Sequence, residues 1–212
     1  MELIVVRHAE PHRVDPGDGA GAGGAADPAL TPRGRDQASR LAAWLALEPV
    51  DHVVTSPLRR ARETAAPVAA TFGLEPEVDD DLREYDAASD SYIPIEELRA
   101  SKSDEWYATI NGRWDVLGHE PPDAVRDRVV PRFEDLIARF PGGTVVVVAH
   151  GGVINVYLAH VLDLGASLWF HPDYTSVSRV RAARSGPRSL VSLNDIAHLL
   201  ATGRERRTWT DA

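Results

Sequence analysis

Several features that would point to particular functions are missing from this sequence. Its 212 residues include no cysteine, which excludes disulfides, thiolate metal sites and cysteine nucleophiles. No stretch approaches the ~18 consecutive apolar residues of a membrane-spanning helix. The first residues read as a strand rather than as a secretory signal. We therefore expect a cytoplasmic protein that has no membrane partner.

Positive charge is also in short supply. Lysine and arginine together number 23, against 32 aspartates and glutamates, so the formal net charge is −9. This balance argues against a nucleic-acid partner, which would require a basic face. Any anionic ligand must instead be captured by a local group of arginines. Hydrophobic residues make up 43% of the chain, enough for the core of a single domain spanning residues 1–212.

Two segments with the pattern of buried parallel strands each end on a histidine. Residues 3–6 (LIVV) are followed by Arg7 and His8, and residues 144–149 (TVVVVA) are followed by His150. Ligands of open α/β sheets bind at the carboxyl ends of the strands. The sequence therefore predicts a site where both histidines and Arg7 meet at one edge of the sheet.

The other segments alternate between helix and strand patterns. Thr31 and Ser56 each precede a proline and are expected to cap helices, the second of which runs to about Phe72. Pro67 lies inside that second helix and should kink it or end its first part. Further helices are expected at 125–140, 153–162 and 196–200, and further strands at 51–55, within 75–84, and at 176–183 and 189–193.

Two regions do not fit this alternation. Residues 11–29 are rich in glycine and alanine and predict a mobile surface loop. Residues 86–120 have a weak pattern, with one helix expected near 94–108. Such an excursion between strands is typical of a cap over the active edge.

A cluster of arginines opens the helix that follows the second strand. Residues 56–64 read SPLRRARET, so Arg59, Arg60 and Arg62 lie near a helix N-terminus, where free N–H groups suit a phosphate. Neighbours on a helix point in different directions, so the three cannot share one site. We expect Arg59 and Arg62 to be solvated charges on the helix surface.

Together these segments resemble the histidine phosphatase superfamily, also called the phosphoglycerate mutase-like family. The resemblance implies an α/β protein with three α/β/α layers, a mostly parallel central sheet and a partly helical cap. It covers most of the chain outside 11–29 and 86–120. The matching segments are 7–10 (RHAE), 30–38 (LTPRGRDQA), 56–61 (SPLRRA), 148–152 (VAHGG) and 192–199 (SLNDIAHL).

The resemblance also implies roles for individual residues. His8 would be the nucleophile that forms a phosphohistidine, and imidazole chemistry permits this. Arg7 and Arg60 would bind the phosphate, and His150 would donate to one of its oxygens. Gly151, which follows His150, is expected to line the same site. Arginines can neutralise a transferring phosphoryl group, so no metal or other cofactor is expected.

The reaction further needs a group that protonates the leaving oxygen and later activates water. The family supplies an acidic residue after the second helix, and Glu84 in Leu82-Arg83-Glu84-Tyr85 matches it. Asp81 and Asp86 are alternatives, because the segment after Tyr85 departs from the family pattern.

The function expected from this reading is a metal-independent phosphomonoesterase acting on a small phosphorylated metabolite. One alternative is a cofactor-dependent phosphoglycerate mutase, and another is an inactive phosphate-binding module. A metal hydrolase using His8, Glu10 and His150 is a further possibility, although no pair shows the helical spacing of zinc ligands. The sequence leaves a homodimer open.

Four other histidines and two tryptophans are not expected to take part in the chemistry. His12, His119 and His171 are expected at the surface or in supporting positions, and His160 in a structural one. Trp106 and Trp114 are expected to be buried against the cap.

Overall fold

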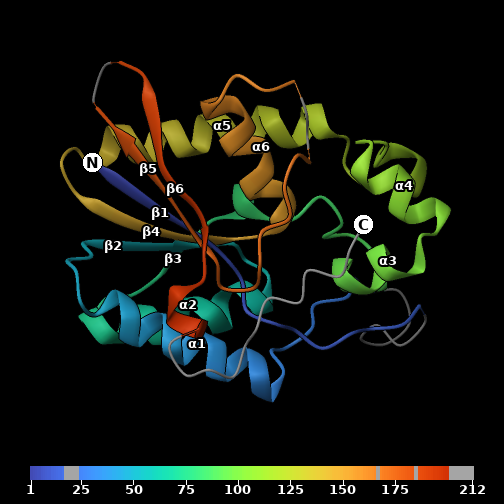
Figure 1. Cartoon of the computed structure of the whole chain (residues 1–212), viewed down its shortest axis with the longest axis horizontal. Helices are drawn as coiled ribbons and strands as arrows, with labels where there is room; N and C mark the ends of the chain where they lie inside the picture. Colours follow the sequence, from blue (N-terminus) through green and yellow to red (C-terminus); the bar gives the residue numbers. More distant parts are fainter. Residues whose placement is uncertain (17–23, 166–167, 184–185, 201–212) are drawn as a thin grey trace.

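The central sheet has six strands in the order β3-β2-β4-β1-β5-β6 (Figure 1). The computed structural model describes residues 1–16, 24–165, 168–183 and 186–200. The strands are β1 (Glu2–Arg7), β2 (His52–Thr55), β3 (Glu77–Val78), β4 (Thr144–Ala149), β5 (Val177–Ala182) and β6 (Arg188–Asp195). The pairs β1–β4, β4–β2 and β2–β3 are parallel, whereas β5 and β6 continue the sheet antiparallel. The prediction of a mostly parallel α/β sheet is confirmed.

Side chains of the central strands alternate between two hydrophobic cores. Leu3 and Val5 of β1 pack with residues of α5 (Pro122–Arg139) and α6 (Gly151–Val161). Both helices lie on one face of the sheet (Figure 1). Ile4 and Val6 pack on the other face with α1 (Pro32–Leu45) and α2 (Arg59–Phe72). All four side chains are completely buried. The alternation follows from the strand repeat of two and produces the three layers.

The two predicted helix caps have different outcomes. Thr31 caps α1 as expected, because its side chain accepts a hydrogen bond from the N–H of Gly34. The prediction that Ser56 caps the second helix was wrong, because α2 starts at Arg59 with Leu58 in the capping position. The Ser56 hydroxyl lies 2.7 Å from the ring of His150 instead. Pro67 does not end α2, which continues to Phe72.

Residues 86–120, called the cap below, lie between β3 and α5 in the chain. The prediction of a single helix near 94–108 was wrong, because two helices occur there, α3 (Ile95–Ser101) and α4 (Asp104–Ile110). Lys102 separates them in the left-handed region, with φ of 49°, and Ser103 caps the second. A 3-10 turn, η2 (Asp115–Leu117), follows. Figure 1 shows α3 and α4 beyond the carboxyl ends of the parallel strands.

The ends of the glycine-rich segment are held together. Pro11 and Leu30 form an antiparallel bridge, and Val14 forms another with Tyr92 of the cap. Residues 17–23 of the expected loop and the tail from Thr202 lie outside the described residues. Among the described residues, no helix combines the length and apolar character needed to cross a membrane.

The sheet register brings the strand ends to one place. Arg7 pairs with Ala149 and Thr55 with Val148, so the residues that follow these strand ends become neighbours. A 3-10 turn, η1 (Asp80–Leu82), follows β3, and α6 begins at Gly151, two residues before the predicted start. The last three elements of the described part are β5, β6 and α7 (Ala197–Leu200), as expected.

Candidate active site

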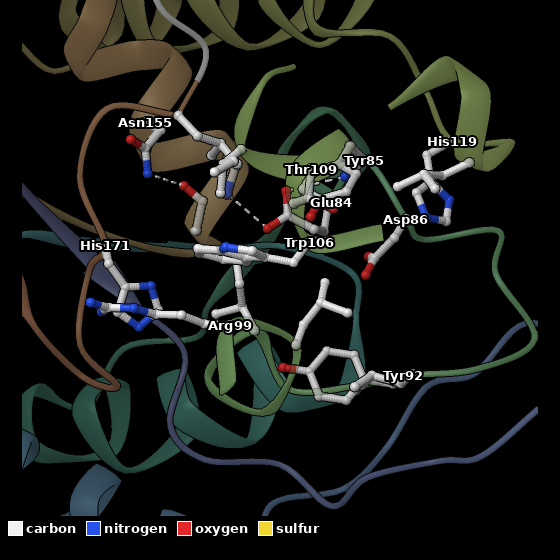
Figure 2. Close-up of a pocket in the computed structure, with 18 of the residues that line it drawn as sticks. Glu84, Tyr85, Asp86, Tyr92, Arg99, Trp106, Thr109, His119, Asn155 and His171 are labelled. Carbon is white, nitrogen blue, oxygen red and sulfur yellow. Dashed lines mark hydrogen bonds between the residues drawn. The ribbon is translucent and has the colours of Figure 1, made fainter. Parts of the chain in front are cut away.

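A cavity of about 650 Å³ lies between the carboxyl ends of the parallel strands and the cap (Figure 2). This size is typical of a small-molecule site. Five of the six site residues predicted from sequence line it, namely Arg7, His8, Arg60, Glu84 and Gly151. The sixth, His150, is completely buried, with its ring centroid 5.0 Å from that of His8.

His8 follows the end of β1, and its ring is held in one tautomer. Its Nδ1 lies 2.8 Å from the carbonyl oxygen of Ala9, which can only accept a hydrogen bond. Nδ1 therefore carries the proton of the neutral ring, and Nε2 keeps its lone pair. Burial, together with the charges of Arg60 and Arg7, places the pKa of His8 well below its ordinary value. A neutral imidazole with a free Nε2 has the form that a nucleophile requires.

His150 occupies the capping position of α6. Its Nε2 lies 2.7 Å from the hydroxyl of Ser56, while its buried Nδ1 has no hydrogen-bond partner. Burial is the first cause that lowers the pKa of His150 well below its ordinary value, and the charge of Arg60 is the second. The ring is therefore neutral, and one of its nitrogens is not committed to another protein group.

Arg7 is the last residue of β1, and its guanidinium is immobilised on two sides. NH1 donates to Glu96 at 2.8 Å and to the carbonyl oxygen of Pro172 at 2.7 Å. The ring of Tyr174 covers one face, with its centroid 4.0 Å from Cζ. Arg7 Nε is buried without a hydrogen-bond partner, so the guanidinium still has unused donors.

Of the three arginines at the start of α2, the structure places Arg60 in the cavity. Its side chain is 1% exposed, with Cζ 4.6 Å from the ring centroid of Tyr92 and NH2 3.7 Å from Asp86. Arg59 is exposed and pairs with Glu63 one turn along the helix, and Arg62 is also exposed. Two guanidinium groups, Arg60 and Arg7, thus line the cavity with His8.

Glu84 reaches the cavity from the loop that follows η1. Its Oε2 accepts a hydrogen bond of 2.9 Å from the N–H of Gly152, and its Oε1 accepts one of 3.1 Å from the N–H of Tyr85 (Figure 2). Burial and the nearby charge of Asp86 outweigh these contacts and raise the pKa of Glu84 to about 7. A carboxyl group that titrates near neutrality can both donate and accept a proton.

The two alternatives to Glu84 lie in different surroundings. Asp81 is exposed and does not line the cavity. Asp86 does line it, but its carboxylate faces the guanidinium of Arg60. Of the three residues, Glu84 is the one that is buried.

The two glycines after His150 have different surroundings. A Cβ at Gly152 would lie 2.4 Å from Glu84 Oε1 and 2.6 Å from a ring carbon of Tyr85. A Cβ at Gly151 would meet only Pro172, at 3.8 Å. Gly152 therefore allows the close approach of Glu84, while Gly151 leaves space at the cavity wall.

Sequence reasoning missed the carboxylate that contacts Arg7. Glu96 lies on α3 of the cap and accepts hydrogen bonds from Arg7, His171 and Tyr174. No local pattern distinguishes Glu96 from its neighbour Glu97, because the contact joins residues 89 positions apart.

The two tryptophans differ in their surroundings, and so do the histidines that were not expected to take part in the chemistry. Trp114 is completely buried as expected, whereas Trp106 lines the cavity together with His119 and His171 (Figure 2). His160 is exposed, so the structural position expected for it was wrong, and His12 is exposed as expected.

Glu10, the third residue of the metal-hydrolase alternative, is not among the residues that line the cavity. The carboxylate of Glu10 contacts Thr31 at 2.9 Å and Arg33 at 2.7 Å, away from His8 and His150. Throughout the described ranges, no group of three or more His, Asp or Glu residues is arranged to hold a metal ion.

Comparisons with known proteins show the family to which the chain belongs. A family model described as the histidine phosphatase superfamily (branch 1) matches residues 3–196. Phosphoserine phosphatase 1 of Hydrogenobacter thermophilus is 32% identical over 203 residues, covering 94% of this chain and 94% of that protein. Phosphoglycerate mutase-like protein 4 of Arabidopsis thaliana is 35% identical over 164 residues, 73% of this chain and 68% of that protein.

The chain is also similar to a solved structure and to three longer proteins. Mycobacterial glucosyl-3-phosphoglycerate phosphatase, solved with inorganic phosphate, has a TM-score of 0.73 and 27% identity. The match covers 93% of this chain and 98% of the mycobacterial one. The chain spans 54% of the length of three further mycobacterial proteins, to which it is 30% identical.

Proposed function

The chain belongs to the histidine phosphatase superfamily and is a phosphoric monoester hydrolase, and we propose that it acts on a small phosphorylated metabolite through a phosphohistidine on His8. The observation that carries this proposal is the His8 ring itself, which is buried, neutral and protonated on Nδ1 next to two guanidinium groups. Both relatives named as phosphatases have small phosphorylated metabolites in their names.

The first chemical step is attack by His8 Nε2 on the phosphorus atom of the substrate. The N–P bond forms as the bond from phosphorus to the leaving oxygen breaks. Arg7 and Arg60 bind the phosphoryl oxygens, and His150 donates an N–H to one of them. Glu84, protonated below its raised pKa of about 7, gives its proton to the leaving oxygen.

The second step reverses these roles. Glu84, now a carboxylate, takes a proton from a water molecule that attacks the phosphohistidine. The N–P bond breaks, inorganic phosphate is released, and His8 recovers its lone pair. The pKa near 7 suits both steps, because the group must exchange one proton in each direction. The arginines supply the charge neutralisation, and we therefore propose that no metal ion takes part.

The leaving group of the substrate occupies the part of the cavity formed by the cap. Aromatic and aliphatic side chains line this part, Leu98 and Trp106 from the cap, and Trp169 and Phe170 from the facing segment between α6 and β5. Arg99, His119 and His171 provide polar contacts in the same region. We expect this mixture to set substrate preference, because apolar walls with a few polar groups are typical of selective small-molecule sites.

The test is direct trapping of the covalent intermediate. Rapid quenching with p-nitrophenyl phosphate should yield an acid-labile, base-stable phosphoenzyme in the unaltered protein. His8→Ala should form no phosphoenzyme and should lose turnover, while its thermal midpoint stays close to that of the parent protein. Turnover should also persist in the presence of a chelator.

Three results would contradict the proposal. Full activity of His8→Ala would show that another group is the nucleophile. Loss of activity in a chelator, restored by a divalent cation, would show a metal-dependent reaction. If a bisphosphoglycerate-dependent interconversion ran faster than phosphate release, the protein would be a mutase instead.

A further inference from the structure

A single carboxylate of the cap accepts hydrogen bonds from three residues that lie outside the cap. Glu96 Oε1 accepts hydrogen bonds from Arg7 NH1 at 2.8 Å and from His171 Nε2 at 3.2 Å. Glu96 Oε2 accepts one from the hydroxyl of Tyr174 at 3.0 Å. We propose that Glu96 is a positioning residue that orients Arg7 for phosphate binding. This inference rests on the proposed function, in which Arg7 binds the phosphoryl group.

Hydrogen bonds within the protein occupy one end of the Arg7 guanidinium. NH1 has two hydrogens, and both have acceptors, Glu96 Oε1 and the carbonyl oxygen of Pro172. The remaining donors are those of Nε and NH2, on the other edge of the planar group. Because NH1 is held and the Tyr174 ring covers one face, that edge has a fixed direction. A planar donor group oriented in advance binds a phosphate with a smaller loss of conformational freedom.

The contact differs from an ordinary surface ion pair. The Arg7 side chain is 3% exposed, and Glu96 is 39% exposed. Burial alone raises the pKa of Glu96, but the charge of Arg7 and the hydrogen bonds from His171 and Arg7 lower it far below its usual range. Glu96 is therefore ionised whenever the enzyme is folded at moderate pH. Water screens such a partly buried pair less than an exposed one.

The position of Glu96 also links Arg7 to the cap. The same short helix, α3, lines the cavity with Leu98 and Arg99. One element thus holds the phosphate-binding arginine and contacts the region where the leaving group binds. Loss of Glu96 should disturb the phosphate end of the site without removing any group that touches the substrate.

Two effects of Glu96 oppose each other and give opposite predictions. As a positioning group it strengthens phosphate binding, but as a negative charge beside Arg7 it weakens attraction for a phosphate. We expect orientation to dominate, because Arg7 would otherwise keep only Pro172 as a partner for NH1. If orientation dominates, loss of Glu96 weakens phosphate binding. If repulsion dominates, loss of Glu96 strengthens it.

The experiment measures binding of inorganic phosphate by calorimetry, together with kcat and KM for p-nitrophenyl phosphate. Glu96→Ala should weaken phosphate binding about tenfold, as expected for loss of a hydrogen bond to a charged group. Glu96→Gln keeps an oxygen acceptor for Arg7 and should lose less. Tyr174→Phe removes the hydroxyl donor but keeps the ring on Arg7, and should give a smaller loss of the same sign.

The matched control is Glu97→Gln on the same helix, since Glu97 contacts Arg13 rather than the cavity. It should leave phosphate affinity, kcat and KM unchanged. In an Arg7→Ala background, the further change Glu96→Ala should have no effect on phosphate binding. This cycle separates orientation of Arg7 from a general effect on the fold of the cap.

Tighter phosphate binding in Glu96→Ala would overturn the inference and would identify Glu96 as a competing anion. Unchanged binding would also overturn it, as would an equal loss in the Arg7→Ala background. The calorimetric measurement does not depend on turnover, so it stands apart from the test of His8. An active His8→Ala protein would refute the proposed function and leave the Glu96 result to be judged separately.

Discussion

The carboxylate of Glu84 accepts a hydrogen bond of 2.9 Å from the backbone N–H of Gly152, two residues after His150. Gly152 lies in the first turn of α6, where N–H groups have no partner within the helix. Glu84 provides one, and the loop after η1 is thereby tied to the helix that His150 begins. The residue proposed as proton donor thus has a fixed position relative to the buried histidine pair.

This contact predicts that Gly152 cannot carry a side chain. Gly152→Ala would place a methyl group 2.4 Å from Glu84 Oε1, so the carboxyl group must move. We expect kcat for an alkyl phosphate to fall on the order of a hundredfold, as when a positioned acid is lost. Gly151→Ala, which meets no atom closer than 3.8 Å, should fold with an unchanged thermal midpoint. Normal alkyl phosphate turnover in Gly152→Ala would show that this position of Glu84 is not required.

The role of Glu84 as proton donor should depend on the leaving group. An alkoxide is a basic leaving group and needs a proton in the transition state, whereas p-nitrophenolate does not. Glu84→Gln should therefore slow phosphoenzyme formation from an alkyl phosphate by roughly 10²–10⁴-fold and affect that from p-nitrophenyl phosphate far less. Rapid-quench rates for the two substrates give the measurement.

The matched variant for this test is Asp86→Asn, because Asp86 also lines the cavity. It should not show the dependence on the leaving group. If Asp86→Asn showed it and Glu84→Gln did not, the proton donor would be Asp86. Equal slowing of both substrates in Glu84→Gln would indicate a positioning role.

The raised pKa of Glu84 also predicts how stability varies with pH. Its pKa is about 7 in the folded protein and near 4.5 for an ordinary glutamate, so the folded state binds its proton more tightly than the unfolded state. The resulting stabilisation is fully present below about pH 4 and is lost as the pH rises through 7. Glu84→Gln should therefore gain stability relative to the parent by up to about 3 kcal/mol between pH 5 and pH 8. The free energy of unfolding of both proteins, measured across this range, gives the test. A difference between them that does not change with pH would rule the shift out.

The three arginines at the start of α2 should differ sharply in importance. Arg60→Ala removes a buried cation from the cavity and should cost roughly 2–4 kcal/mol of transition-state stabilisation, by comparison with loss of one oxyanion donor. Arg59→Ala and Arg62→Ala remove exposed charges and should change kcat/KM little. Steady-state kinetics on one substrate can compare all three. A large loss in Arg59→Ala or Arg62→Ala, with none in Arg60→Ala, would show that a different arginine binds the phosphate.

Much of the site could be predicted from local sequence patterns. The apolar runs that become β1 and β4 identify buried strands, because a strand covered on both faces needs apolar residues throughout. Arg7, His8 and His150 follow these strands directly, so their shared edge follows from the geometry of a parallel sheet. Helix geometry indicated that the three arginines of α2 cannot share one site, and the resemblance to the family then selected Arg60.

Other features depend on contacts between distant segments. Ser56 has the local signature of a helix cap, yet its hydroxyl lies against His150, 94 residues away, and α2 starts later. The cap was predicted as one helix because nothing in its composition indicates the left-handed conformation of Lys102 that divides it. Glu96 has no local feature that separates it from Glu97, and only the docking of α3 places it on Arg7.

The sequence by itself determined which chemical groups stand at the carboxyl ends of the strands, because strand patterns and the residues that follow them are local properties of the chain. The tertiary structure alone decided their ionisation and orientation. The pKa of Glu84 is raised by burial and by Asp86, and Arg7 is oriented by a carboxylate 89 residues away. The first effect comes from desolvation and a nearby charge, and the second from a hydrogen bond. Both depend on closeness in space, which the order of residues along the chain does not specify.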